Sequence, residues 1–261
     1  VIKIITPGTM TDYAMLDEKK NNYLMSIYKN KTFYGIACVD LTTGEFLSTY
    51  ITFGNTFNKL MDEIAKFSPS EIVVNGEFFH DEELKNTLRK RFDVYISTME
   101  DGFFEKDFCK EKVRSYFKDY VIEENAFDLY INASGALLEY LEQTQKVNLS
   151  HIQSFNVYRI EEYMILDMAT RRNLELTETM REKNRKGSLL WVLDRTMTSM
   201  GGRTLRKWIE QPLINLHDIK DRLNAVNEFK EKFMARSEVR ELLRAVYDIE
   251  RLMSKVILGS A

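Results

Sequence analysis

The sequence predicts a protein of two parts, an α/β region followed by a mostly helical region. Over about the first 100 residues, β-branched and aromatic runs alternate with apolar residues at helical spacing, in the order β-β-β-α-β-α-β. From about Phe103 onwards, helical spacing dominates and strand-like runs become rare. A meander followed by βα units predicts a mixed sheet flanked by helices.

Three strands open the predicted sheet, at Asn22–Tyr28, Thr32–Asp40 and Glu45–Phe53. Polar turns at residues 29–31 and 41–44 separate them, which predicts that neighbouring strands run antiparallel.

Two helix-then-strand units follow. The first predicted helix runs to Phe67, with Asn55 or Thr56 as its N-cap and Pro69 as its stop. The next elements predicted along the chain are a strand at Glu71–Asn75, a helix at Asp81–Arg91 and a strand at Phe92–Ile96.

The helical region opens with a predicted helix at Ala126–Gln145, whose apolar face is interrupted at Gly135. A short extended stretch is expected at Ser154–Ile160. Further helices are predicted at Leu189–Arg195, Gly202–Glu210, His217–Phe229 and Ser237–Leu258. We expect a linker over residues 1–9, a first domain over 10–112 and a second over 113–261, truncated at its C-terminus.

Composition excludes several classes of protein. With 261 residues, 44% hydrophobic and 30% charged, and with only 3 Pro and 11 Gly, the chain is neither disordered nor collagen-like. It has no apolar run long enough to span a membrane, and its cysteines, Cys38 and Cys109, lack metal-binding spacing, which favours the cytoplasm. Because it opens on Val1 and a helical pattern still runs at Ala261, we expect an excised fragment.

Positive charge is concentrated in one window. The net charge is −3, yet residues 171–207 hold ten basic and four acidic residues, a local charge of +6. This pattern indicates either a surface facing DNA phosphates or another domain, or solvated helix faces plus a basic loop. The candidate residues are Arg181, Lys183, Arg185 and Lys186.

The motifs of nucleotide binding and nucleophilic catalysis are absent from the sequence. It holds no G-x-x-x-x-G-K-[ST] loop and no G-x-S-x-G elbow, and its three histidines lie far apart. We therefore predict no catalytic, metal or nucleotide-binding residue. One alternative is a Mg²⁺-dependent nuclease, because Asp40 ends a strand in an element order that resembles ribonuclease H-like folds, with Glu45, Glu77 and Asp107 as further carboxylates. The favoured interpretation makes Asp40 a turn residue that accepts local N–H bonds.

Four aromatic residues also stand out. Phe78 and Phe79 follow a glycine turn and form either a partner-binding patch or a contact between helix and sheet, of which the second is favoured. Trp191 and Trp208 lie in helix-like stretches and are expected in the core.

Several ordered blocks of the sequence together resemble the MutS family of DNA mismatch-recognition proteins. Thr6-Pro7-Gly8-Thr9 resembles the linker that leads into its second domain and favours the mismatch-repair branch. The family's core signature is similar to residues 164–176 and, more extensively, to residues 187–213, where Gly201, Arg203 and Gln211-Pro212-Leu213 match.

The resemblance implies a ribonuclease H-like connector domain without nuclease activity, followed by the first part of the helical core, or lever, domain. The family's mismatch-inserting motif would precede this segment and its ATPase would follow it, so this fragment would need no cofactor, whereas the parent uses ATP and Mg²⁺. The implied role is a relay between the mismatch and the ATPase sites of a homodimer, with MutL docking on the connector. The alternatives are the nuclease and a free-standing DNA-binding module.

Overall fold

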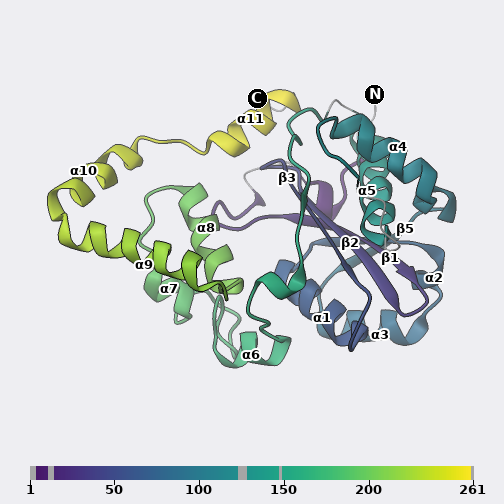
Figure 1. Ribbon diagram of the computed structural model, residues 1–261, viewed down its shortest axis with the longest axis horizontal. Coiled ribbons are helices and arrows are strands. Elements are labelled where there is room, and N and C mark those ends of the chain that lie inside the picture. The colour runs from purple at the N-terminus through teal and green to yellow at the C-terminus, as the bar shows by residue number, and fades with distance from the viewer. Residues whose placement is uncertain (1–3, 11–14, 123–127, 147–148, 260–261) are drawn as a thin grey trace. The chain divides into compact units, whose positions relative to one another are not determined.

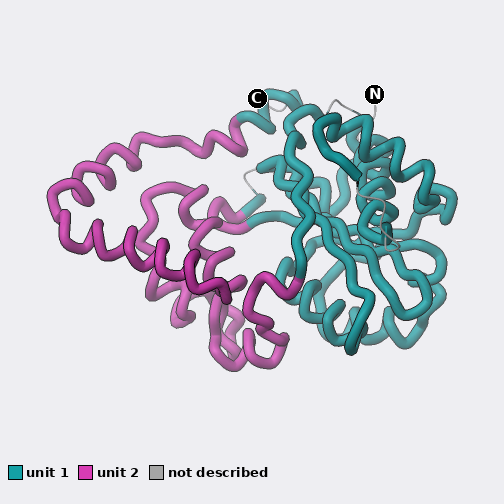
Figure 2. Tube along the Cα trace, in the orientation of Figure 1, with its two compact units in different colours: residues 1–16, 21–159, 253–261 teal, residues 17–20, 160–252 magenta. Residues whose placement is uncertain are grey.

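The computed structural model describes residues 4–10, 15–122, 128–146 and 149–259. The chain divides into two compact units (Figure 2). Unit 1 comprises residues 1–16, 21–159 and 253–261, and unit 2 comprises residues 17–20 and 160–252. No helix among the described residues is long and apolar enough to cross a membrane.

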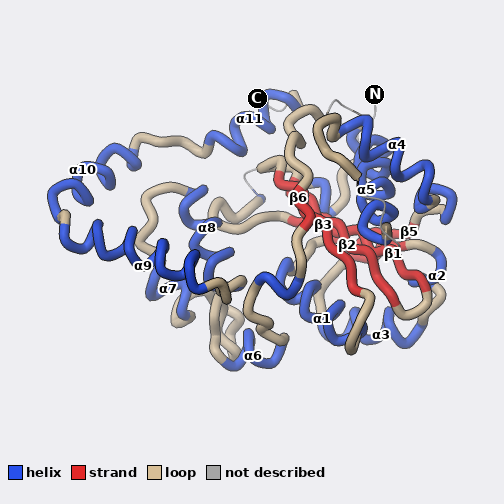
Figure 3. The backbone as a smooth tube through the Cα atoms, viewed as in Figure 1, coloured by secondary structure: helices blue, strands red, loops and turns tan. Residues whose placement is uncertain are grey.

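A mixed six-stranded sheet forms the centre of unit 1 (Figure 3). The strand order is β5-β4-β1-β2-β3-β6. The antiparallel meander β1-β2-β3 joins parallel pairs on both sides, β1 with β4, β4 with β5 and β3 with β6, which confirms the predicted mixed sheet. The strands are β1 Tyr23–Asn30, β2 Phe33–Asp40, β3 Glu45–Ile51, β4 Glu71–Val74, β5 Tyr95–Thr98 and β6 Asn156–Val157.

Helices cover both faces of this sheet (Figure 1). Alternation along β2 turns Ala37 and Val39 towards α5 (Leu129–Gln145), and the intervening Cys38 towards α1 (Thr56–Phe67). Asn55 caps α1 by accepting the N–H of Asn58 at 3.0 Å. The helix ends at Phe67, as predicted, and Ser68 follows in the left-handed region, directly before Pro69.

The helix α5 packs unusually close to its neighbours because two glycines permit it. A Cβ on Gly35 of β2 would lie 1.9 Å from the Leu129 carbonyl oxygen. A Cβ on Gly135 would lie 2.4 Å from the Cα of Cys109, which belongs to α4 (Lys106–Tyr116). Gly135 therefore does not interrupt the apolar face of α5 but is the point at which α4 and α5 meet.

The compact units divide later in the chain than the boundary expected after residue 112. The helix α5 packs onto the sheet and α4 packs onto α5, and α5 contributes Ile131, Leu137 and Leu141 to the core. The division therefore falls after Arg159, where the last sheet strand, β6, has ended. The change in sequence pattern correctly predicted where helices begin to dominate. The first of these helices nevertheless belong to unit 1, because they share the core of its sheet.

Short helices complete the surface of unit 1. They are α2 Gly76–Phe79 and α3 Glu82–Arg91, with 3₁₀ turns η1 Pro7–Thr9 and η3 Asp101–Phe104. The α3 helix begins after Asp81, which accepts the N–H of Leu84 at 3.0 Å, as expected of an N-cap.

Unit 2 is built of helices, as predicted. Its elements are the 3₁₀ turn η4 Ile160–Glu162 and the helices α6 Met168–Asn173, α7 Leu189–Leu193, α8 Ser199–Glu210, α9 Leu216–Glu231 and α10 Phe233–Arg244; α11 Ile249–Ile257 begins in it. The single helix predicted at Ser237–Leu258 is wrong. The structure forms α10 and α11 there, and Asp248 between them accepts the N–H of Arg251 in the first turn of α11.

Candidate functional site

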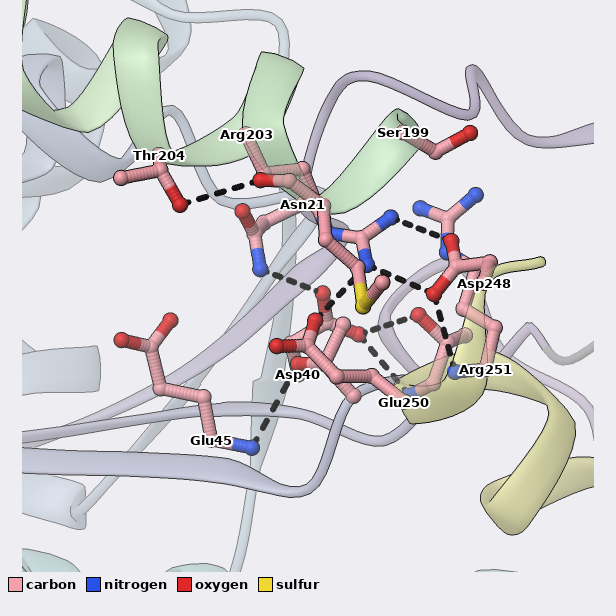
Figure 4. A network of polar contacts seen from close by, with 12 residues as sticks. Asn21, Asp40, Glu45, Ser199, Arg203, Thr204, Asp248, Glu250 and Arg251 are labelled. Atoms are coloured by element: carbon pink, nitrogen blue, oxygen red, sulfur yellow. Dashed lines mark hydrogen bonds and ion pairs between the residues drawn. The ribbon is translucent and has the colours of Figure 1, made fainter. Parts of the chain in front are cut away.

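Asp40 lies at the end of β2 as a buried turn residue. Its carboxylate accepts a hydrogen bond from the Asn21 side chain at 2.8 Å (Figure 4). It also accepts the Thr42 N–H and hydroxyl at 2.8 and 2.7 Å. Its carbonyl accepts the N–H of Gly44 at 2.8 Å. These contacts confirm the interpretation of Asp40 as a residue that closes the turn after its strand.

The carboxylates expected to accompany Asp40 in a nuclease are directed elsewhere. Glu45 accepts the hydroxyl of Tyr23 at 2.7 Å, and Glu77, on α2, pairs with the ammonium of Lys29 at 3.2 Å. Asp107 lies in the first turn of α4. Within the described part of the chain, no three His, Cys, Asp or Glu side chains gather as a metal site would require. The four carboxylates, all among the described residues, are not gathered as two-metal chemistry requires.

Phe78 and Phe79 point in different directions on α2. Phe78 is fully buried, whereas Phe79 is half-buried. The Lys85 ammonium lies over the Phe79 ring, 4.1 Å from its centroid. Successive helical residues are turned about 100° apart, so the burial of one ring does not require the burial of the next. The hypothesis of a patch made of both rings is therefore wrong, because only Phe79 of the two is exposed in part.

In the basic window, Asp194 is the centre of a cluster of contacts that sequence reasoning did not single out. Its side chain is 2% exposed and accepts the Lys19 ammonium at 3.1 Å and the Thr196 hydroxyl at 2.6 Å. Arg185 also pairs with it. Burial favours the neutral acid, but the hydrogen bonds from Thr196 and from the Lys19 ammonium outweigh it and lower the pKa of Asp194 to about 2.

Arg203 forms the second ionic cluster of unit 2. Its guanidinium is nearly buried and binds both oxygens of Asp248, at 2.6 and 2.8 Å, and Glu250 at 2.7 Å (Figure 4). It also donates to the Glu18 carbonyl at 2.8 Å. Burial alone would lower the pKa of Arg203, but the two carboxylates raise it above its usual value. This arginine is fixed in place by the protein.

Ion pairs and carbonyl contacts thus take up much of the predicted basic surface. Arg206 pairs with Glu210 at 3.2 Å, and Arg171 donates to the Glu210 carbonyl at 2.8 Å. Of the four candidates, Arg185 belongs to the Asp194 cluster, whereas Arg181, Lys183 and Lys186 are exposed on the loop between α6 and α7. Hydrogen bonds between Thr179 and the backbone of Lys183 and Asn184 shape that loop.

The two tryptophans do not lie in a core as expected. Trp191 is 45% exposed and Trp208 is 44% exposed, and the guanidinium of Arg222 lies 3.9 Å from the Trp208 ring centroid. Helical spacing indicated an apolar face correctly, but unit 2 offers that face little to pack against.

Family models match both parts of the chain. MutS domain II matches residues 22–153, which lie in unit 1, and MutS domain III matches residues 169–261. The chain belongs to the MutS family. Residues 22–153 correspond to the connector domain of this family, and residues 169–261 correspond to its core domain.

Three curated relatives match this chain over its whole length. It is 90% identical over 261 residues to the DNA mismatch repair protein MutS of Acetivibrio thermocellus, and 64% identical over 260 residues to that of Ruminiclostridium cellulolyticum. The MutS protein of Alkaliphilus oremlandii is 45% identical over 270 residues. The chain spans about 30% of the length of each of these relatives.

Proposed function

We propose that this chain is the relay segment of a mismatch-repair MutS, coupling a mismatch-binding domain to an ATPase domain without catalysing a reaction itself. The observation that carries the proposal is the match of MutS domains II and III to the chain, which folds as two compact units. Coupling between distant sites needs bodies that move as units. The densely packed sheet of unit 1 and the helices of unit 2 are suited to such a role.

The parent protein would supply the rest of the cycle. We propose that it binds mismatched duplex DNA as a homodimer at the nucleoid in the cytoplasm, and uses ATP and Mg²⁺. The chain contains no phosphate-binding loop, and its described residues form no cluster of metal-ligating side chains. ATP and Mg²⁺ would therefore be held by other parts of the parent.

We test the relay in the Acetivibrio thermocellus protein, because it is 90% identical to this chain. Arg203→Lys keeps the charge but loses the two-pronged contact with Asp248. We expect mismatch binding and basal ATP hydrolysis to persist while mismatch-stimulated nucleotide exchange slows about tenfold. Arg244→Lys, at an exposed ion pair with Glu241, is the matched control. Equal stimulation in both variants would contradict the relay.

The connector also provides a docking surface for MutL, in our proposal. Phe79, half-buried at the surface of unit 1, is a candidate contact. The test is a titration of the isotope-labelled chain with the N-terminal domain of MutL, followed by amide chemical shifts. Shifts clustered on residues 10–110 and weakened by Phe79→Ala would support docking through this residue. A flat titration would show that the isolated chain does not bind MutL.

A second role belongs to the exposed basic loop. We propose that Arg181, Lys183 and Lys186 face DNA phosphates in the assembled protein, because no ion pair within the described chain occupies them. Replacing all three by glutamine should reduce the salt dependence of DNA binding by up to about three counterions. An unchanged salt slope would mean that the loop faces another domain instead.

A further inference from the structure

The N-terminal segment Ile4–Thr9, here called the strap, is attached to unit 1 along its length. The Ile4 N–H donates to the Thr144 carbonyl of α5 at 2.9 Å. The Pro7 carbonyl accepts the Asn22 side chain at 3.2 Å. The Gly8 N–H donates to the carboxylate of Glu71, on β4, at 3.0 Å. The strap lies before the segment matched by MutS domain II, which begins at residue 22, yet it belongs to the same compact unit.

Glu71 is a fully buried carboxylate at the start of β4. Besides Gly8, it accepts the Ser97 hydroxyl and the Tyr140 hydroxyl, each at 2.6 Å. Burial, and then the bond to Glu71, raises the pKa of Tyr140 to about 12. A buried carboxylate is tolerated only when such donors replace water. Each of its three donors comes from a different segment, namely the strap, β5 and α5.

Gly8 is the residue that allows the strap to come this close. A Cβ at this position would lie 2.7 Å from the Leu24 side chain and 2.9 Å from the Cβ of Glu71. The turn around it is closed by its own hydrogen bonds, because the Thr9 hydroxyl accepts the Thr6 N–H at 2.9 Å and the Thr6 carbonyl accepts the Thr9 N–H at 3.1 Å. The four residues Thr6-Pro7-Gly8-Thr9 are therefore shaped to present one N–H group to Glu71.

We propose that Glu71 is a positioning residue that locks the Thr6–Thr9 turn onto the sheet. The strap is then fixed to unit 1 and does not move as a flexible linker would. If the relay described above operates, which this step assumes, a displacement of the preceding domain is transferred directly to β4 rather than absorbed by a flexible linker.

Amide exchange in the 261-residue chain tests the lock. Gly8→Ala should accelerate exchange of the Ile4 amide at least about tenfold, because the added methyl group pushes the strap away from Leu24 and Glu71. The amides of Met25 and Val39, in the centre of the sheet, should keep their protection. Gly102→Ala is the matched control, because a Cβ there meets nothing within 4 Å. An unchanged Ile4 amide would overturn the proposal, and so would equal acceleration of the sheet amides.

Tyr140→Phe provides a second variant that preserves packing. It removes one donor to Glu71 and keeps the ring, so the Gly8 amide should shift in the spectrum and exchange several-fold faster. No change at Gly8 would show that the turn is held by its own threonines and not by Glu71.

The same Gly8→Ala change in the Acetivibrio thermocellus protein separates the two proposals. A freed strap together with a weakened mismatch-stimulated nucleotide exchange supports both. A freed strap with undiminished stimulation overturns the relay through the strap and leaves the lock intact. A protected strap overturns the lock alone.

Discussion

Different forces stabilise the interiors of the two units. Unit 1 encloses a continuous apolar core that runs from the sheet through α5 to α4 and includes a cluster of aromatic rings around Phe155. In the described residues of unit 2, the only buried hydrophobic side chains are Leu176 and Leu190. Its other buried side chains are polar or charged, and they are Ser188, Arg203, Gln211 and Arg251.

The two units are therefore sensitive to different conditions. Apolar burial does not depend on ionisation, whereas an ion pair loses its attraction when its acidic partner is protonated. Salt screens buried pairs such as those of Asp194 and Arg203 much less than exposed ones. The helices α9 and α10 leave large apolar side chains in solvent, including Leu223 at 61%, Phe233 at 61% and Leu242 at 73% exposure. Unit 2 thus depends on its ionic clusters more than unit 1 does.

The largest effect should come from the core of unit 1. Leu137, on α5, is fully buried, and Leu137→Ala should lower the free energy of unfolding of this unit by about 2–5 kcal/mol. Leu242→Ala, the same change at an exposed position of unit 2, should cost less than about 0.5 kcal/mol. Urea unfolding followed by circular dichroism measures both, and similar values would abolish the distinction between the two units.

Close packing of α4 on α5 should show the next effect. Gly135→Ala places a methyl group against the backbone of Cys109, which cannot move aside as a flexible side chain would. We expect a loss of about 1–3 kcal/mol in unit 1. Thermal unfolding measures the loss, with Gly102→Ala as the control; a neutral Gly135→Ala would show that the two helices slide apart easily.

Acid should loosen unit 2 through Asp194. Its folded pKa of about 2 lies below the value of roughly 3.9 in an unfolded chain. The carboxylate therefore stabilises unit 2 fully above about pH 4, and this contribution disappears as the pH falls towards 2. Both tryptophans lie in unit 2, so their fluorescence reports the acid transition of that unit.

The variant Asp194→Asn isolates this effect. It should cost about 1–3 kcal/mol at neutral pH and flatten the acid transition, because the Lys19 and Arg185 contacts lose their charge. An acid transition of unchanged steepness would assign the effect to other carboxylates.

The smallest effect should come from ion pairs that are open to solvent. Arg244 and Glu241 on α10 are both largely exposed, and Arg244→Ala should change stability by no more than about 0.5 kcal/mol. Differential scanning calorimetry at low and high salt measures it. A larger loss would mean that unit 2 relies on its surface charges as well as on its buried clusters.

Local patterns predicted most of the regular structure. The meander, the α1 cap at Asn55 and the helix predicted at Asp81–Arg91 follow from residues close together in sequence, and all three are present, the last as α3 at Glu82–Arg91. The break between α10 and α11 had no such signal, because neither glycine nor proline marks residues 245–248. Arg203 binds Asp248 there, 45 residues away in sequence.

Long-range contacts also explain what was missed in the candidate sites. In the sequence, Glu71 is only a polar residue at the start of a predicted strand. Its contact with the Gly8 N–H, 63 residues away, is not visible there. Composition alone identified the basic window. It did not show which basic side chains form ion pairs, because that depends on the positions of Asp194 and Glu210 in the fold. Helical periodicity would have allowed Phe78 and Phe79 to differ in burial if the four-residue helix α2 had been predicted.

The order in which the chain is made has a consequence for unit 1. Leu258 packs into the same core as the sheet, although unit 2 intervenes between Arg159 and Met253. During synthesis, the sheet and its covering helices leave the ribosome roughly 5–20 s before this last side chain does. The nascent unit must therefore wait with one site of its core open, and a chaperone that recognises apolar surface would find it there until translation reaches Leu258.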